Sequence, residues 1–121
     1  MTTTTTTFDL GQLADAIEAR DADRQTELYA PDATVTISDR LSQPGAPRVI
    51  QGREAIASWI KDTCAREMTH SVGSRVQDDG GAAFVVKCRY ADGTNVVCAT
   101  VLELAGSLIA KQTVVQAWDE R

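Results

Sequence analysis

Residues 82–104 read AAFVVKCRYADGTNVVCATVLEL and decide the fold, because two β-rich runs flank the pair Asp92-Gly93. Branched and aromatic residues favour strands, and Asp-Gly between two such runs is a strong hairpin signal. If Asp92-Gly93 forms a two-residue turn, Cys88 lies opposite Val97 on the neighbouring strand. The stretch therefore predicts a β-hairpin with a defined register.

This register divides the side chains of the hairpin between two faces. One face is expected to carry Phe84, Val86, Cys88, Tyr90, Val97, Ala99 and Val101. Cys98 then points to the other face with Val96, Thr100, Leu102 and Leu104, which excludes a bond between Cys88 and Cys98. Both faces are mainly apolar, whereas a sheet covered on one side only normally has a polar outer face. We therefore expect a homodimer in which a second copy covers the convex sheet face.

Strand patterns continue on both sides of the hairpin. Upstream, Val72 and Val76 alternate and are expected to face the core, and a turn follows at residues 78–81. Downstream, residues 108–118 follow Gly106 and close the chain. Three tight turns thus link four antiparallel strands.

Helical spacing dominates the first half of the chain. Leu10, Leu13, Ala14 and Ile17 fall at i, i+3, i+4 and i+7, which predicts a helix over residues 8–20 with Asp9 as its N-cap. Further segments are a short helix at 22–29, a strand at 33–37, a loop at 39–47, an extended piece at 48–51 and a third helix at 53–66. Helices followed by an antiparallel meander indicate an α+β fold with the helices packed on one face of the sheet.

Length and composition limit the class of protein. The 121 residues are 43% hydrophobic and 24% charged, which suits one folded domain and excludes disorder or collagen-like repeats. We expect a disordered tail over residues 1–7 and one domain over residues 8–121. The sequence shows neither an apolar run long enough to span a bilayer nor a secretory signal, so we expect a cytoplasmic location.

Charge and cysteine spacing exclude further classes. The formal charge is −5 and the basic residues are scattered, so neither nucleic acid nor an anionic membrane is a predicted partner. Cys64, Cys88 and Cys98 show no C-x-x-C spacing, which argues against a disulfide framework and a thiolate zinc site. Phosphate-binding glycine loops and metal-ligand spacings are also missing, so no cofactor and no metal are predicted.

Three segments resemble one known superfamily. They are residues 27–35 (ELYAPDATV), residues 52–56 (GREAI) and residues 70–76 (HSVGSRV), the last followed by Asp79-Gly80. In this order they are similar to SnoaL-like members of the nuclear transport factor 2-like superfamily. The resemblance implies a cone-shaped α+β fold, in which a curved antiparallel sheet packs on three N-terminal helices. That superfamily includes isomerases, cyclases, dehydratases, epoxide hydrolases and non-catalytic binding proteins, so the fold alone does not decide the function.

The catalytic pattern of ketosteroid isomerase, one member of this superfamily, is not matched. Leu13 stands where that enzyme has the tyrosine of its first helix, and Val101 stands where it has the oxyanion-hole aspartate. Ile37 stands in place of the general base. A typical ketosteroid isomerase is therefore not predicted, although Trp118 matches a pocket aromatic that the family often has near the chain end.

The resemblance also implies a mostly apolar cavity between the concave sheet face and the helices. Its expected lining is Trp59, Phe84, Val86, Cys88, Tyr90, Val97, Ala99, Val101, Val114 and Trp118. Gln112 and Gln116 share strand parity with the last two, so their amides can orient a carbonyl or hydroxyl group. A small apolar molecule is the expected ligand. The alternative is that the aliphatic members only fill a core.

Two side chains are candidate catalytic groups. His70 is the only histidine, a residue type that exchanges protons near neutral pH, and it shares parity with the inward valines of its strand. Asp39 follows Val35 and Ile37 at period two, which predicts a position at the cavity mouth. A satisfied histidine and a turn aspartate are the alternatives, and Glu103 is a weaker candidate.

Two functions remain open at this point. In the first, His70 and Asp39 perform acid/base isomerase, cyclase or hydrolase chemistry on a small apolar substrate. In the second, the domain is a non-catalytic ligand-binding or dimeric scaffold protein. A nucleophile set is not predicted, because no glycine-framed turn surrounds Ser74, Cys88 or Ser107.

Overall fold

The fold consists of three helices and six strands within residues 7–120, the part of the chain that the computed structural model describes. In order, the elements are α1 (Leu10–Glu18), α2 (Ala22–Thr26), β1 (Tyr29–Ser38), β2 (Arg48–Gln51), α3 (Arg53–Ala65), β3 (Met68–Gln77), β4 (Gly81–Tyr90), β5 (Asn95–Ala105) and β6 (Leu108–Trp118). Of the tail expected over residues 1–7, residues 1–6 lie outside the described part. None of the described helices combines the length and the apolar character that crossing a bilayer requires.

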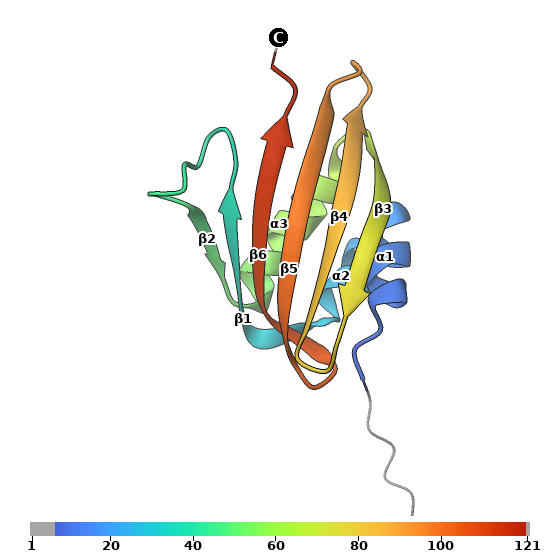
Figure 1. The fold of residues 1–121 in the computed structure, drawn as a ribbon, viewed down its shortest axis with the longest axis vertical. Helices are drawn as coiled ribbons and strands as arrows, with labels where there is room; N and C mark the ends of the chain where they lie inside the picture. Colours follow the sequence, from blue (N-terminus) through green and yellow to red (C-terminus); the bar gives the residue numbers. More distant parts are fainter. Residues whose placement is uncertain (1–6, 121) are drawn as a thin grey trace, which may run out of the picture.

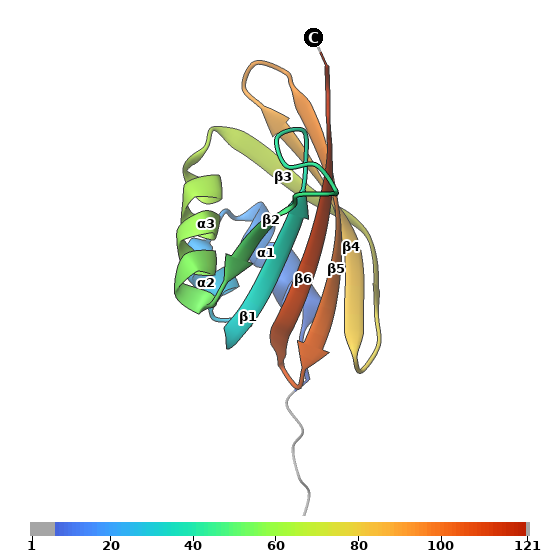
Figure 2. The same cartoon turned by 90° about the vertical axis from the view of Figure 1, so that its left-hand side faces the viewer.

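All six strands form one curved sheet, and the three helices lie on one side of it (Figures 1 and 2). The strand order is β2-β1-β6-β5-β4-β3. The α+β class and the antiparallel meander from β3 to β6 are confirmed. The sheet as a whole is mixed rather than purely antiparallel, because β1 runs parallel to β6. Parallel neighbours are joined through long connections, and the residue pattern of β1 does not reveal which strand it joins.

Helix α1 forms as the spacing of its apolar residues predicts. Asp9 precedes it in an extended conformation, and its carboxylate accepts a hydrogen bond from the Gln12 amide at 3.1 Å. Leu13 is buried, and α1 packs against β3. After the helix, Arg20 Nη1 donates to the Arg66 carbonyl at 2.8 Å. This bond ties the end of α1 to the chain between α3 and β3.

Helix α2 is shorter than predicted, and β1 is longer. The helix ends at Thr26 and the strand begins at Tyr29. The Ile109 amide donates to the Leu28 carbonyl at 2.8 Å, and Arg53 Nε donates to the Tyr29 carbonyl at 2.8 Å. Because these two carbonyl groups bind partners that are distant in sequence, they are not used in a further helical turn.

A bulge in β3 reverses the predicted orientation of Val76. Val72 pairs with Val86, but the register shifts before Arg75, which pairs with Phe84. One extra residue in a strand turns the side chains that follow to the opposite face. Val76 is therefore 70% exposed, and the expectation that it faces the core is wrong.

The turn between β4 and β5 contains three residues instead of two. The Tyr90 amide donates to the Thr94 carbonyl at 2.9 Å, and Gly93 has a positive φ of 90°. A turn followed by a left-handed glycine is a common alternative to the two-residue hairpin loop. Cys88 consequently pairs with Val96, and not with Val97 as predicted. Every side chain of β5 therefore lies on the face opposite to the predicted one.

This change of register exposes a set of valines on the outer, convex sheet face. Val97, Val101 and Val115 are 40%, 54% and 54% exposed. Ala99 and Glu103 are exposed on the same face. The predicted places of Val97, Ala99 and Val101 in the cavity lining are therefore wrong, and so is the inward position considered for Glu103.

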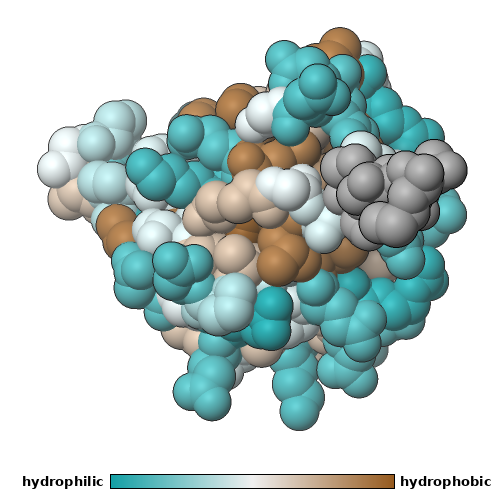
Figure 3. Space-filling view, turned by 90° about the horizontal axis from the view of Figure 1, so that it is seen from below, coloured by the Kyte–Doolittle hydropathy of each residue, from teal (hydrophilic) through white to brown (hydrophobic). Residues whose placement is uncertain are grey.

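One end of the molecule carries the β3–β4 and β5–β6 turns. Seen from there, hydrophobic side chains gather at the centre and hydrophilic ones surround them (Figure 3). Leu104 and Leu108 flank the β5–β6 turn and are only partly buried. Apolar side chains thus close this end of the fold, whereas the Asp92-Gly93 turn and the 39–47 loop lie at the other.

Candidate functional site

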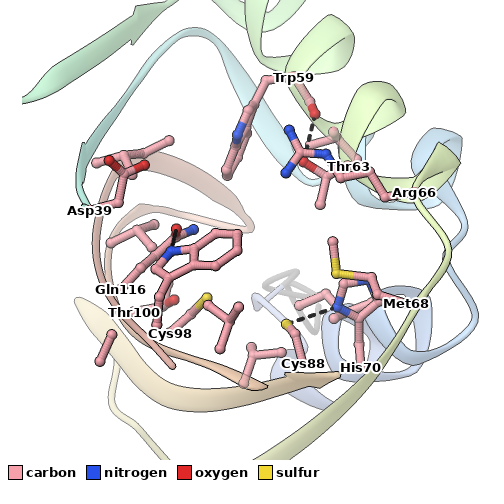
Figure 4. A pocket seen from close by; sticks show the side chains of 18 of the residues that line it. Asp39, Trp59, Thr63, Arg66, Met68, His70, Cys88, Cys98, Thr100 and Gln116 are labelled. Atoms are coloured by element: carbon pink, nitrogen blue, oxygen red, sulfur yellow. Dashed lines mark hydrogen bonds between the residues drawn. The ribbon is translucent and has the colours of Figure 1, made fainter. Parts of the chain in front are cut away.

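A cavity of about 1330 Å³ lies between the concave sheet face and the helices. Its size exceeds the roughly 300–1,000 Å³ of ordinary small-molecule sites, because it is open at one end. The half-buried Asp39 and the exposed Asp92 and Asp119 surround this mouth. Trp59 and Trp118 both line the cavity, and Trp59 extends from α3 toward its open space (Figure 4).

Most of the predicted site residues line this one cavity. They are Asp39, Trp59, His70, Phe84, Val86, Cys88, Tyr90, Gln112, Val114, Gln116 and Trp118. Asp39 and His70 lie on different sides of the space (Figure 4). Their position is thus established, and their part in binding or catalysis stays a prediction.

Strand pairing aligns the side chains of the concave face in rows. One row crosses β3 to β6 and consists of His70, Cys88, Val96 and Trp118. The next row consists of Val72, Val86, Cys98 and Gln116. Cys88 and Cys98 are therefore diagonal neighbours on the same face, which corrects the expectation that they point apart. Both are free thiols.

Polar side chains of these two rows form a group around the Cys88 sulfur. Trp118 Nε1 donates to Gln116 Oε1 at 3.0 Å. Gln116 pairs across the strands with Cys98, which lies diagonally from Cys88. From the other side, His70 Nδ1 lies 3.1 Å from Cys88 Sγ (Figure 4). We refer to these five side chains as the thiol relay.

The thiol relay moves the pKa values of its two cysteines in opposite directions. The hydrogen bond from Cys98 lowers the pKa of Cys88 most strongly, and His70 lowers it further, although burial opposes both. The hydrogen bond to Cys88 raises the pKa of Cys98, and burial adds to this effect. Cys88 therefore carries negative charge more readily than an ordinary thiol, while Cys98 keeps its proton.

Trp118 is held between two side chains at the mouth. Tyr90 stacks on it with ring centroids 5.7 Å apart, and Arg40 Cζ lies 4.1 Å from the centre of its ring. The Asp39 carboxylate accepts hydrogen bonds from two backbone amides of the loop that follows it, at 2.9 and 2.7 Å. Asp39 thus fixes the loop that carries Arg40, as expected of a turn aspartate.

The sequence patterns did not predict two features of the site. Cys98 and Thr100 line the cavity but were expected to point away from it. Gly93 is the residue that indicates a longer β4–β5 loop, because a left-handed glycine fits the third position of a three-residue loop as well as a two-residue turn. The contact between His70 and Cys88 was not predicted, because it arises from cross-strand pairing and not from a glycine-framed turn.

Tyr29 and Gln112 form a buried polar pair on the floor of the cavity. The Tyr29 hydroxyl donates to Gln112 Oε1, and both side chains are almost fully buried. Burial raises the pKa of Tyr29 well above its ordinary value near 10. The Gln112 amide oxygen is thus engaged within the protein.

This pair predicts a loss of stability at alkaline pH. Above about pH 10 the unfolded chain releases the Tyr29 proton while the folded protein keeps it, so the free energy of unfolding falls by about 1.4 kcal/mol per pH unit. Tyr29→Phe is expected to remove this contribution to the slope, and Tyr90→Phe at the mouth is expected to retain it. Urea unfolding between pH 8 and 11 measures the difference. Equal slopes in wild type and Tyr29→Phe would refute the assignment.

The fold and the cavity define the class of protein: an α+β domain in which a curved sheet and helices enclose a large open cavity. The family model for the SnoaL-like domain matches residues 10–112, and the chain belongs to this family. A comparison with curated proteins found no match. In the described residues, no group of three or more His, Cys, Asp or Glu side chains is arranged to hold a metal ion.

Solved structures share this fold at low sequence identity. An NTF2-like protein of unknown function from Mesorhizobium loti has a TM-score of 0.79 at 13% identity, over 89% of this chain and 87% of that one. A protein from Kribbella flavida described as a "putative ketosteroid isomerase" has a TM-score of 0.74 at 20% identity, over 92% and 75%. A "putative polyketide cyclase" from Sinorhizobium meliloti has a TM-score of 0.66 at 23% identity, over 87% and 91%. These similarities show the fold alone.

Proposed function

We propose that this protein binds a small, mainly apolar molecule with a carbonyl group, and that His70 transfers a proton on that molecule. The observation that carries the proposal is the position of His70 in a large cavity whose other walls are mostly apolar. Histidine is the side chain best suited to exchange protons near neutral pH. This is chemistry of the isomerase, cyclase or hydrolase type.

The surroundings of His70 support this role. Its Nδ1 is engaged with Cys88, and its Nε2 makes no hydrogen bond to any residue of the described part of the chain. Thr100 and Gln116 line the same cavity and offer groups that can donate to a carbonyl oxygen. Charge that develops on that oxygen during proton removal is stabilised by such donors.

Asp39 has a different part in this proposal. Its carboxylate holds the mouth loop through two backbone amides, and it lies across the cavity from His70. We therefore assign proton transfer to His70 and the shape of the mouth to Asp39. The structures described as an isomerase and a polyketide cyclase are consistent with a carbonyl ligand in this fold.

Binding of a bicyclic ketone tests the cavity directly. Trp59 and Trp118 both line it, so saturable quenching of tryptophan fluorescence by a tetralone is expected. Trp118→Ala is expected to weaken binding about tenfold, because a stacked aromatic wall contributes about 1.5 kcal/mol. Val76→Ala on the outer face is the control and should bind as the wild type does. Absence of saturable binding would favour the scaffold alternative.

We also propose that a second copy of this chain covers the convex sheet face. Val85, Ala99 and Val115 align across three strands at its centre, and their neighbours Val97 and Val101 are exposed. Lys87 and Arg89 lie toward one end of this patch and Glu103 toward the other. Lys111 pairs with Glu103 at that second end, so the dimer is expected to depend on the apolar centre of the patch rather than on charge pairing.

Val115→Lys tests this dimer. A lysine at the centre of an apolar interface is expected to raise the dissociation constant at least about 100-fold, because the charge loses its hydration. Sedimentation at micromolar concentration should give twice the monomer mass for the wild type and the monomer mass for the variant. The control is Leu41→Lys, an exposed position in the mouth loop. A monomeric wild type would contradict the proposal.

A further inference from the structure

We propose that Cys88 is a nucleophile that adds to the β-carbon of an α,β-unsaturated carbonyl compound bound in the cavity, with His70 as the group that takes and returns its proton. This inference rests on the proposed function, since it uses the same cavity and the same carbonyl ligand. It narrows the ligand to an enone. It also gives His70 a partner that the proton-transfer proposal does not need.

The geometry carries this assignment. His70 Nδ1 lies 3.1 Å from Cys88 Sγ, and both side chains line the cavity. A cysteine within hydrogen-bond reach of a histidine is the usual arrangement of an activated thiol nucleophile. Cys98 lies diagonally from Cys88 on the same sheet face, and its interaction with that sulfur also lowers the pKa of Cys88. A protonated His70 beside this sulfur stabilises a thiolate there.

The other members of the thiol relay lie farther along the two rows. Trp118 Nε1 donates to Gln116, and Gln116 pairs with Cys98 across the strands. His70 contacts the Cys88 sulfur and not Cys98, so the negative charge is expected on Cys88. Cys64 also lines the cavity, but burial raises the pKa of its thiol. Of the three cysteines, only Cys88 has both a histidine partner and a lowered pKa.

The covalent step balances without an oxidant or a further reactant. The Cys88 thiol gives its proton to His70 Nδ1, and the resulting imidazolium donates a hydrogen bond to the thiolate. The sulfur forms a bond to the β-carbon while the π electrons of the C=C bond move toward the carbonyl oxygen to give an enolate. The imidazolium then returns the proton to the α-carbon. The same steps in reverse release the enone, with the geometry about the former double bond exchanged if rotation occurs in between.

Several charged or titratable groups lie on the elements around this pair. Glu18 of α1 accepts a hydrogen bond from the β3 backbone at Val72, and Arg20 binds the backbone at the start of β3. On the cavity wall are Cys64, Arg66 and Tyr90, and the mouth carries Asp39, Arg40, Asp92 and Asp119. His70 Nδ1 contacts the Cys88 sulfur itself, so the pair is expected to dominate the pH profile.

Covalent labelling with benzylideneacetone tests the inference. Intact-mass and peptide analysis of the wild type at pH 7 is expected to find one adduct, on Cys88, with a rate that saturates as the enone concentration rises. The rate should rise with pH to a midpoint below the value near 8.5 of a free cysteine. His70→Gln is expected to slow labelling at pH 7 about tenfold and to move the midpoint upward. Cys98→Ala should slow it as well, and Cys98→Ser, which keeps a donor, should restore the rate.

The controls separate this inference from the proposed function. Val76→Ala on the outer face should label as the wild type does, and benzylacetone, the saturated ketone, should bind without forming an adduct. Saturable binding of benzylacetone together with first labelling at Cys64 or Cys98 would overturn the nucleophile and leave the pocket intact. Unchanged labelling of Cys88 in His70→Gln would also overturn it. Failure of both ketones to bind saturably would overturn the inference together with the proposed function.

Discussion

His70→Gln is expected to slow the exchange of α-protons of a bound tetralone about 10²- to 10⁴-fold, the usual contribution of one general acid or base. Glutamine occupies a similar volume and keeps hydrogen-bonding groups, but it does not titrate. Proton NMR of the ketone in deuterated buffer measures the exchange rate. Tryptophan fluorescence, measured in parallel, is expected to show ketone affinity within a factor of about three of the wild type.

Asp39→Asn is the matched comparison for this experiment. An asparagine Oδ1 can still accept the two loop amides that Asp39 binds, so the mouth should keep its shape. Exchange is therefore expected to stay close to the wild-type rate. A large loss of exchange rate in Asp39→Asn with little change in His70→Gln would assign proton transfer to Asp39 instead of His70. Wild-type exchange rates in both variants would reject both residues as catalytic groups.

Leu102→Ala is expected to lower the free energy of unfolding by about 2–5 kcal/mol, because it leaves a cavity in a closely packed core. Leu102 is 1% exposed and lies on the inner face of β5. Leu41→Ala removes the same atoms at a position that is 86% exposed, and it should change stability by less than about 0.5 kcal/mol. Urea unfolding of both variants provides the comparison. A small effect at Leu102 would mean that β5 faces the other way.

The fold was predictable because its main signals are local. The spacing of Leu10 and Leu13 and the cap at Asp9 specified α1, and the strand patterns specified the antiparallel meander. The parallel contact between β1 and β6 was not predictable in this way. No pattern in β1 or in the residues beside it indicates that this strand joins β6. The start of the strand at Tyr29 depends on contacts with Arg53 and with β6.

The candidate site was predictable only where the sequence predicted the pairing register of the strands correctly. Phe84, Val86 and Cys88 lie on β4, where alternation alone decided the face, and they line the cavity as expected. Val97 and Val101 lie beyond a turn whose length was misjudged by one residue, and both are exposed instead. The bulge in β3 had the same effect on Val76. Each error concerns a count of residues between strands, which hydrophobic patterns do not encode.

The three-residue loop at Ala91–Gly93 also offers a simple route by which related chains can diversify. Deleting or inserting one residue there would exchange the two faces of β5, which moves Cys98 and Thr100 out of the pocket and brings Val97 and Val101 into it. Glu103 would then point toward the cavity, and Val96 and Leu102 would take the place of Val97 and Val101 on the outer face. One inserted or deleted residue in a surface turn can therefore change which side chains reach the cavity while the rest of the sequence stays the same.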